Sequence, residues 1–244
     1  MKGFVPIAPW DVPSPGDDGR WLAPLSLPEE INRRGFIQAS LGCMAGAASV
    51  GAFATVPDGS ASMSAPQNFW SQPRWVWLRR LGTKEEIKTY YWNDGQLDQQ
   101  AYQKICWFLR DMRFESLLAQ QSPVLTRAVT RGQVAKSQLT PWALMDPIVV
   151  DILYAYSSWL AVYGVSRPLE VTSGFRHFLT NSMTEGAARD SWHTKAGAVD
   201  FTIPGVSIEQ VARFGMWLAG GGVGLYRNKN FTHVDRGRVR SWAK

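Results

Sequence analysis

Apolar and polar residues alternate along two short segments of the chain, residues 169–173 and 198–203, as they do in half-buried β-strands. In the second segment Val199, Phe201 and Ile203 fall on one face, and Asp200 falls on the opposite face. A carboxylate opposite an apolar face belongs either in a pocket or in solvent. The alternation therefore predicts two strands and marks one acidic position as a candidate for chemistry.

Four further segments have the composition of strands. Residues 75–78 and 89–92 are rich in aromatic and β-branched residues, and an Asn-Asp-Gly turn signal follows the second. Residues 222–226 and 231–235 are predicted as a pair of strands joined by residues 227–230.

Three further segments are predicted to be helices. Apolar residues recur every three or four positions in residues 97–112 and 147–162. A third helix is predicted over residues 207–218, because Ser207 is a good capping residue and Glu209 lies in the first turn. Helices that precede a run of strands suggest an α+β fold, with a small, mostly antiparallel sheet and flanking helices.

The beginning of the chain has the pattern of an export signal. Arg33 and Arg34 resemble a twin-arginine motif, and the uncharged, weakly apolar run 35–57 follows them. Cleavage is predicted near residue 54 or 62. A retained membrane anchor is one alternative, and a lipoprotein modified at Cys43 is another. The predicted organisation is a signal region with a disordered start at 1–62, a linker and entry segment at 63–84, and the main domain at 85–244.

The net charge of the chain limits the classes of binding partner but does not identify one of them. The 244-residue chain carries a formal net charge of +6, and the part from residue 63 onward has 22 basic and 14 acidic residues, a net charge of +8. Nucleic acid, anionic lipid and anionic cell-wall polymer all fit a basic protein. An export signal and the lack of a nucleic-acid motif exclude a nucleic-acid partner and leave a function outside the cytoplasm, in the periplasm or cell envelope.

The only three histidines of the chain lie in its last 70 residues, at His177, His193 and His233. If the strands 198–203 and 231–235 are neighbours, Asp200 and His233 point into one site, which His193 reaches from the preceding loop. A catalytic zinc site commonly uses three protein ligands of these types and leaves one position for water. The residues alone therefore allow a zinc site, with unrelated surface histidines as the alternative.

Several ordered motifs resemble a known family. Ser-Trp-His-Thr-Lys-Ala-Gly-Ala-Val-Asp at 191–200 is similar to the signature of the zinc D-Ala-D-Ala peptidases, and Ser-Gly-Phe-Arg at 173–176 is similar to their Ser-Gly-Tyr-Arg segment. The segments 221–226, 231–235 and 240–242 resemble the end of the murein endopeptidase K branch. The resemblance spans about residues 85–242 and implies a hedgehog/D,D-peptidase-like fold.

The resemblance also implies roles for particular residues. It implies zinc ligands at His193, Asp200 and His233, and it places Arg176 and Ser191 in the substrate cleft. Arg176 is expected to bind a substrate carboxylate or to stabilise the developing oxyanion. Ser191 is expected to orient the peptide backbone, or only to cap the loop before His193.

Two positions depart from the family pattern. Ala196 stands where the family usually has glycine, and Asn230 stands where many relatives have a catalytic glutamate. Asp235 shares a strand face with His233, so it is the predicted general base, with the orientation of a metal ligand as its alternative role. His177 is expected either to line the cleft or to be exposed.

The resulting prediction is a zinc-dependent peptidoglycan hydrolase that cleaves peptide cross-links with metal-activated water. The expected partners are peptidoglycan and the twin-arginine translocation machinery. The alternative is a catalytically inactive, zinc-containing module that binds the cell wall. The sequence leaves open which cross-link is cut, and whether the enzyme is an endopeptidase or a carboxypeptidase.

Overall fold

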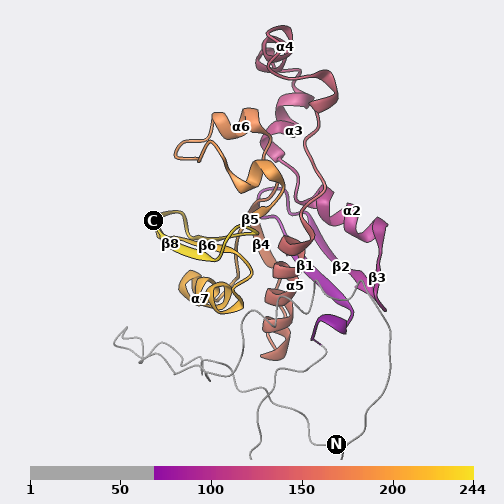
Figure 1. Ribbon diagram of the computed structural model, residues 1–244, viewed down its shortest axis with the longest axis vertical. Helices are drawn as coiled ribbons and strands as arrows, with labels where there is room; N and C mark the ends of the chain where they lie inside the picture. Colours follow the sequence, from indigo (N-terminus) through magenta and orange to yellow (C-terminus); the bar gives the residue numbers. More distant parts are fainter. Residues whose placement is uncertain (1–68) are drawn as a thin grey trace, which may run out of the picture. The chain divides into compact units, whose positions relative to one another are not determined.

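The computed structural model describes residues 69–244 (Figure 1). Residues 71–244 form one compact unit built on a single eight-stranded sheet. The predicted signal region and its alternatives, including the anchor, fall outside the described residues. Within residues 69–244 no helix is long and apolar enough to cross a membrane.

The sheet contains eight strands in the order β3-β2-β1-β4-β5-β7-β6-β8. Two neighbouring pairs, β1 with β4 and β6 with β8, are parallel, and the others are antiparallel. The prediction of a small sheet is therefore wrong, whereas the mixture of helices and a mainly antiparallel sheet is confirmed. The strands are β1 (Arg74–Arg79), β2 (Glu86–Asn93), β3 (Gln96–Leu97), β4 (Leu169–Ser173), β5 (Ala198–Thr202), β6 (Gly222–Tyr226), β7 (Phe231–Asp235) and β8 (Arg240–Ala243).

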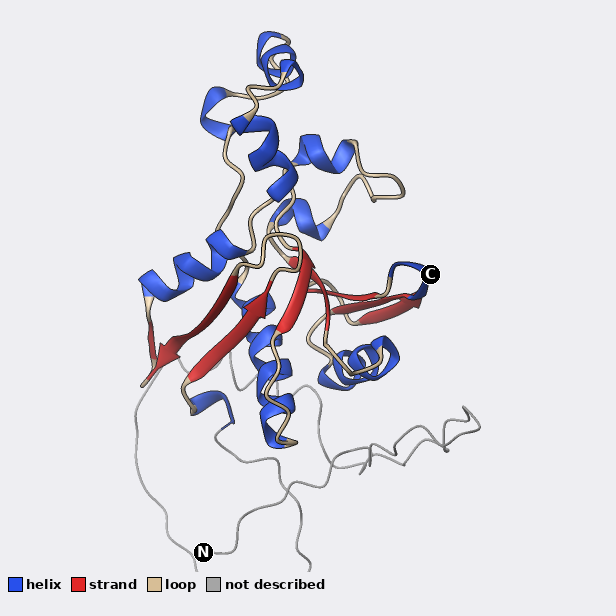
Figure 2. Ribbon diagram, turned by 180° about the vertical axis from the view of Figure 1, so that it is seen from behind, coloured by secondary structure: helices blue, strands red, loops and turns tan. Residues whose placement is uncertain are grey.

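The helices occur both before and after β4 in the sequence. Those before β4 are η1 (Phe69–Ser71), α2 (Gln99–Phe108), α3 (Met112–Ala119), α4 (Pro123–Thr130), η2 (Lys136–Gln138) and α5 (Pro147–Val162). Those after β4 are α6 (Phe178–Ser182), η3 (Trp192–Lys195), α7 (Ile208–Leu218) and η4 (Arg227–Lys229). In Figure 2 the strands lie in front of the long helix α5.

The core lies between the sheet and the helices α5 and α7. Tyr156 of α5 is fully buried and makes edge-to-face contacts with Phe201 of β5 and Phe214 of α7, with ring centroids 4.9 and 4.8 Å apart. Its hydroxyl donates to the carbonyl of Val211, so its polar end is also satisfied. Because Phe201 faces this core, Asp200 next to it must face the opposite side of the sheet.

The predicted helix 97–112 ends earlier than expected, at Phe108. The chain at this point makes hydrogen bonds to distant segments: the carbonyl of Leu109 accepts from the backbone N–H of Phe175, and the N–H of Asp111 donates to the carbonyl of Pro141. The carboxylate of Asp111 then accepts from the first N–H groups of α3 and begins a new helix.

Strand β1 contains residues 75–78, which were predicted to be strand-like, and lies in the entry segment that precedes residue 85. It pairs with β2 on one side and β4 on the other, so the sheet begins before residue 85. Val76 and Leu78 are fully buried, as expected for a strand that lies between two others in the sheet. The helices α3, α4 and α6 and the strand β8 were also not predicted.

Candidate metal centre

The pairing of β5 with β7 positions two of the three candidate ligands. The register places Asp200 directly opposite His233, so both side chains project from the same face of the sheet. This face is turned away from the Tyr156 core. The predicted neighbourhood of these two strands is confirmed.

The third candidate, His193, comes from the short helix η3 that precedes β5. Ser191 caps this helix, because its hydroxyl accepts from the N–H of His193. Ala196 ends the helix with a left-handed backbone (φ 53°), the conformation that glycine adopts most readily. The turn therefore has the glycine-like conformation although alanine occupies the position. Gly197 follows, where a Cβ atom would lie only 2.9 Å from the ring of Trp192.

The three side chains converge in a buried cluster. The Nδ1 atom of His233 lies 2.7 Å from Oδ1 of Asp200 and 3.2 Å from Nε2 of His193, which is itself 3.2 Å from the same oxygen. All three residues are less than 9% exposed. Among the described residues, this is the one group of His, Cys, Asp or Glu side chains whose geometry can hold a metal ion.

A hydrogen-bond partner orients each imidazole with one nitrogen toward the cluster. The Nδ1–H of His193 donates to the carbonyl of Gly174 over 2.7 Å, which leaves Nε2 free to face the cluster. The Nε2 atom of His233 lies 3.1 Å from Oδ2 of Asp235, which directs Nδ1 of this residue inward. Carbonyl or carboxylate partners of this kind are typical of metal-bound histidines, so the donor set fits a metal ion.

The charges of the cluster are strongly coupled. Burial alone would raise the pKa of Asp200, but the neighbouring His193 and His233 hold it well below its usual value. Burial alone would lower the pKa of His233, but its hydrogen bonds to Asp200 and Asp235 raise that pKa to about 9. A metal ion that binds at neutral pH therefore has to displace a proton from His233.

Asp235 is more completely enclosed than a general base is expected to be. It has no exposed surface, and Arg240 holds both carboxylate oxygens, at 3.0 and 2.8 Å. The N–H groups of Gly222 and Gly237 donate to Oδ1. These contacts, with His233, hold the pKa of Asp235 well below its usual value, against the effect of burial. The geometry favours the orienting role of Asp235, and its role as base stays a prediction.

Arg176 lies at the edge of the cluster and is partly exposed. Its guanidinium donates to Oγ of Ser173 over 3.0 Å and lies 3.8 Å from Oδ2 of Asp200. Its backbone N–H donates to the carbonyl of His193. The structure thus brings Arg176 beside the candidate ligands, whereas the hydroxyl of Ser191 is engaged in capping.

His177 is buried, in contrast to the prediction that it is exposed or lines the cleft. Its ring stacks on Phe114 of α3 with centroids 3.7 Å apart, and its Nε2 lies 3.1 Å from the carbonyl of Gln138. Its backbone N–H donates to Asp111. These three partners could not be predicted from the sequence, because all of them lie 39 or more residues away.

A large part of the chain is similar to a known protein family. Residues 136–242, which include all three candidate ligands, match the family described as peptidoglycan L,D-endopeptidase MepK. Over this span the chain is similar to the peptidases of this family.

Two individual relatives are also similar to this chain. The peptidoglycan L,D-endopeptidase MepK of Escherichia coli strain K12 is 28% identical over 186 residues, which cover 75% of this chain and 84% of that protein. The probable peptidoglycan L,D-endopeptidase MepK of Haemophilus influenzae is 38% identical over 102 residues, 40% of this chain and 54% of that protein. No solved structure matches the chain.

The enclosure of Asp235 suggests a test of whether it orients His233 or acts as the general base. We expect Asp235→Asn to lower metal affinity by about 10- to 100-fold, together with activity, because the amide holds His233 less firmly in place. Metal affinity and rate are measured on the same preparation. A variant that keeps full metal affinity but loses at least about 100-fold in rate would restore Asp235 as the general base.

Proposed function

We propose that this peptidase is an exported, zinc-dependent endopeptidase that hydrolyses peptide cross-links in peptidoglycan. The observation that carries the proposal is the convergence of His193, Asp200 and His233, each with one ligand atom within 4.8 Å of the others. We propose that the bond cleaved is an L,D cross-link, because the relatives are named L,D-endopeptidases.

Zinc suits this donor set because two imidazoles and one carboxylate give a three-ligand site with a position left for water. When bound, the ion would lower the pKa of that water to about 7 and polarise the scissile carbonyl. Gly174 and Asp235 hold the two imidazoles in the required orientation, as described above.

Arg176 is proposed to engage the substrate. Its guanidinium contacts Ser173 and lies near Asp200, and its side chain is 17% exposed to solvent. Five N–H donors in a planar fork can bind a carboxylate through two hydrogen bonds or stabilise an oxyanion. Ser191 is proposed to act mainly through its cap on η3, with contact to the peptide backbone as a further role.

Digestion of purified sacculi tests the proposal. Zinc-loaded protein should release muropeptides cut at L,D cross-links, and a chelator should abolish the release. His233→Ala should lose the metal and the activity, whereas Asn228→Ala, an exposed residue of η4, should retain both. Release that persists in the chelator, or products with intact L,D cross-links, would contradict the proposal.

A second candidate function is a zinc-containing module that binds the cell wall without turnover. Two observations favour it: Asn230 occupies the position of the family glutamate, and Arg240 holds both oxygens of Asp235. Sedimentation with sacculi without release of any muropeptide would support this module over the enzyme.

Export is proposed to follow the twin-arginine route, because Arg33 and Arg34 precede a weakly apolar run. Replacing both residues by lysine should leave the precursor in the cytoplasm, as measured by fractionation and immunoblotting. Normal export of the double variant would indicate another route.

A further inference from the structure

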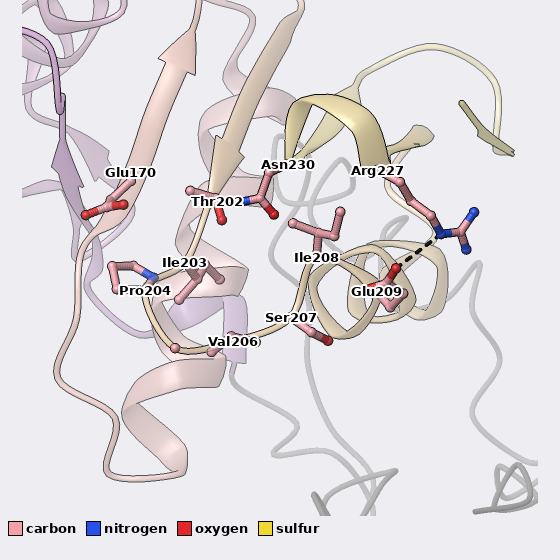
Figure 3. A pocket seen from close by; sticks show the side chains of 11 residues that line it. Glu170, Thr202, Ile203, Pro204, Val206, Ser207, Ile208, Glu209, Arg227 and Asn230 are labelled. Carbon is pink, nitrogen blue, oxygen red and sulfur yellow. Dashed lines mark hydrogen bonds and ion pairs between the residues drawn. The ribbon is translucent and has the colours of Figure 1, made fainter. Parts of the chain in front are cut away.

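A pocket lies beside the metal centre and takes no part in holding the metal. It has a volume of about 440 Å³ and opens where β5 ends, next to the beginnings of α7 and β7. This volume is within the range of sites for small ligands or short peptides. Its lining includes Thr202, Ile208 and Asn230, and no candidate metal ligand (Figure 3).

The register of the sheet fixes the distance between the pocket and the metal centre. Thr202 follows Asp200 by two residues on the same strand, so both side chains point to the same face, roughly 7 Å apart. An extended peptide advances about 3.5 Å per residue. A peptide with its scissile bond at the metal centre therefore reaches the pocket after about two residues.

Two polar groups in this pocket are available to a ligand. Within the described part of the chain, neither the hydroxyl of Thr202 nor the side-chain amide of Asn230 makes a hydrogen bond. Asn230 has a left-handed backbone (φ 52°), which turns the chain from η4 into β7. A hydroxyl and an amide together supply donors and acceptors that match a peptide backbone.

Charged groups lie on both sides of these two residues. In Figure 3 Thr202 and Asn230 lie between Glu170 on one flank and the pair Glu209–Arg227 on the other. Arg79 forms an ion pair with Glu170, which is only 8% exposed. Arg227 uses its Nε atom to bind one oxygen of Glu209 at 3.2 Å, and both side chains are partly exposed.

The single contact between Glu209 and Arg227 leaves polar atoms for a ligand. Among the described residues, the terminal guanidinium nitrogens of Arg227 and the second oxygen of Glu209 have no other hydrogen bond. A ligand that carries an ammonium and a carboxylate on one residue can bind both groups, the ammonium to Glu209 and the carboxylate to Arg227.

The geometry points to a substrate subsite in this pocket, which binds the peptide about two residues from the scissile bond and selects a zwitterionic residue there. Thr202 and Asn230 bind the peptide backbone, Ile208 packs against its aliphatic part, and Glu209 with Arg227 recognises the free ammonium and carboxylate. This assignment rests on the proposed function, because it assumes that a peptide crosses the metal centre.

Binding of an uncrosslinked peptide tests the subsite independently of cleavage. The probe is a synthetic tetrapeptide that contains a diamino acid with a free ammonium and a free carboxylate. Its dissociation constant with the zinc-loaded full chain is measured by calorimetry. Asn230→Gly, which tolerates the left-handed backbone, and Thr202→Val should each weaken binding by about five- to tenfold. The matched control Asn228→Gly should bind as the wild type does.

The chemistry of the probe tests the proposed selectivity. Acetylation of the ammonium or amidation of the carboxylate should weaken binding to the wild type, and Arg227→Gln should remove the effect of amidation. Equal binding of all probes, no binding of any probe, or equal binding by Asn230→Gly and the wild type would overturn the subsite.

The failure of the subsite is distinguishable from failure of the proposed function. In a digestion of sacculi, the subsite variants should raise KM while the metal content and kcat stay near those of the wild type. Selective binding of the probe without any digestion would refute the enzyme and leave the subsite standing. Digestion with unchanged KM in the variants would refute the subsite and leave the enzyme standing.

Discussion

The carboxylate of Asp200, held between two imidazoles, is the interaction on which the site depends. Strand pairing produces it, because Asp200 and His233 are directly opposed in the register of β5 and β7. A shift of one residue in the register of either strand would turn the side chain of Asp200 or of His233 into the core. The apolar residues on the other face of β5, packed against Tyr156, fix the register.

Additional contacts hold this cluster in shape. A carboxylate and two imidazoles that are less than 9% exposed are stable together only if their remaining polar atoms have partners. Gly174 provides one partner, and Asp235 provides the other. Arg240 of β8 in turn neutralises Asp235, so the edge strand β8 contributes to the site although it is two strands away from β7.

The sequence contained the local part of this information. Alternation identified β5, helical spacing identified α5, and the capping pattern of Ser207 identified α7. The spacing of His193, Asp200 and His233 was enough to propose that they meet. These predictions succeeded because the relevant pattern is complete within a few residues of one strand or helix.

The parts that could not be predicted depend on distant partners. The helix over 97–112 stops at Phe108 because Leu109 and Asp111 bond to residues 175 and 141. His177 is buried because Phe114 stacks on it. The sequence placed Asp235 on the face of His233, but only the structure places Arg240 over its carboxylate.

Calorimetric titration of the metal-free chain with Zn²⁺, in buffers of different ionisation enthalpy, measures whether His193, Asp200 and His233 form a metal site. We expect one zinc per chain and at least one proton released at about pH 7, because the pKa of His233 is raised to about 9 and its Nδ1 proton must leave. This proton release should decline as the pH rises through about 9, where His233 is already neutral. Zinc binding without proton release, or undiminished binding by His233→Ala, would show that His233 does not bind the metal as proposed.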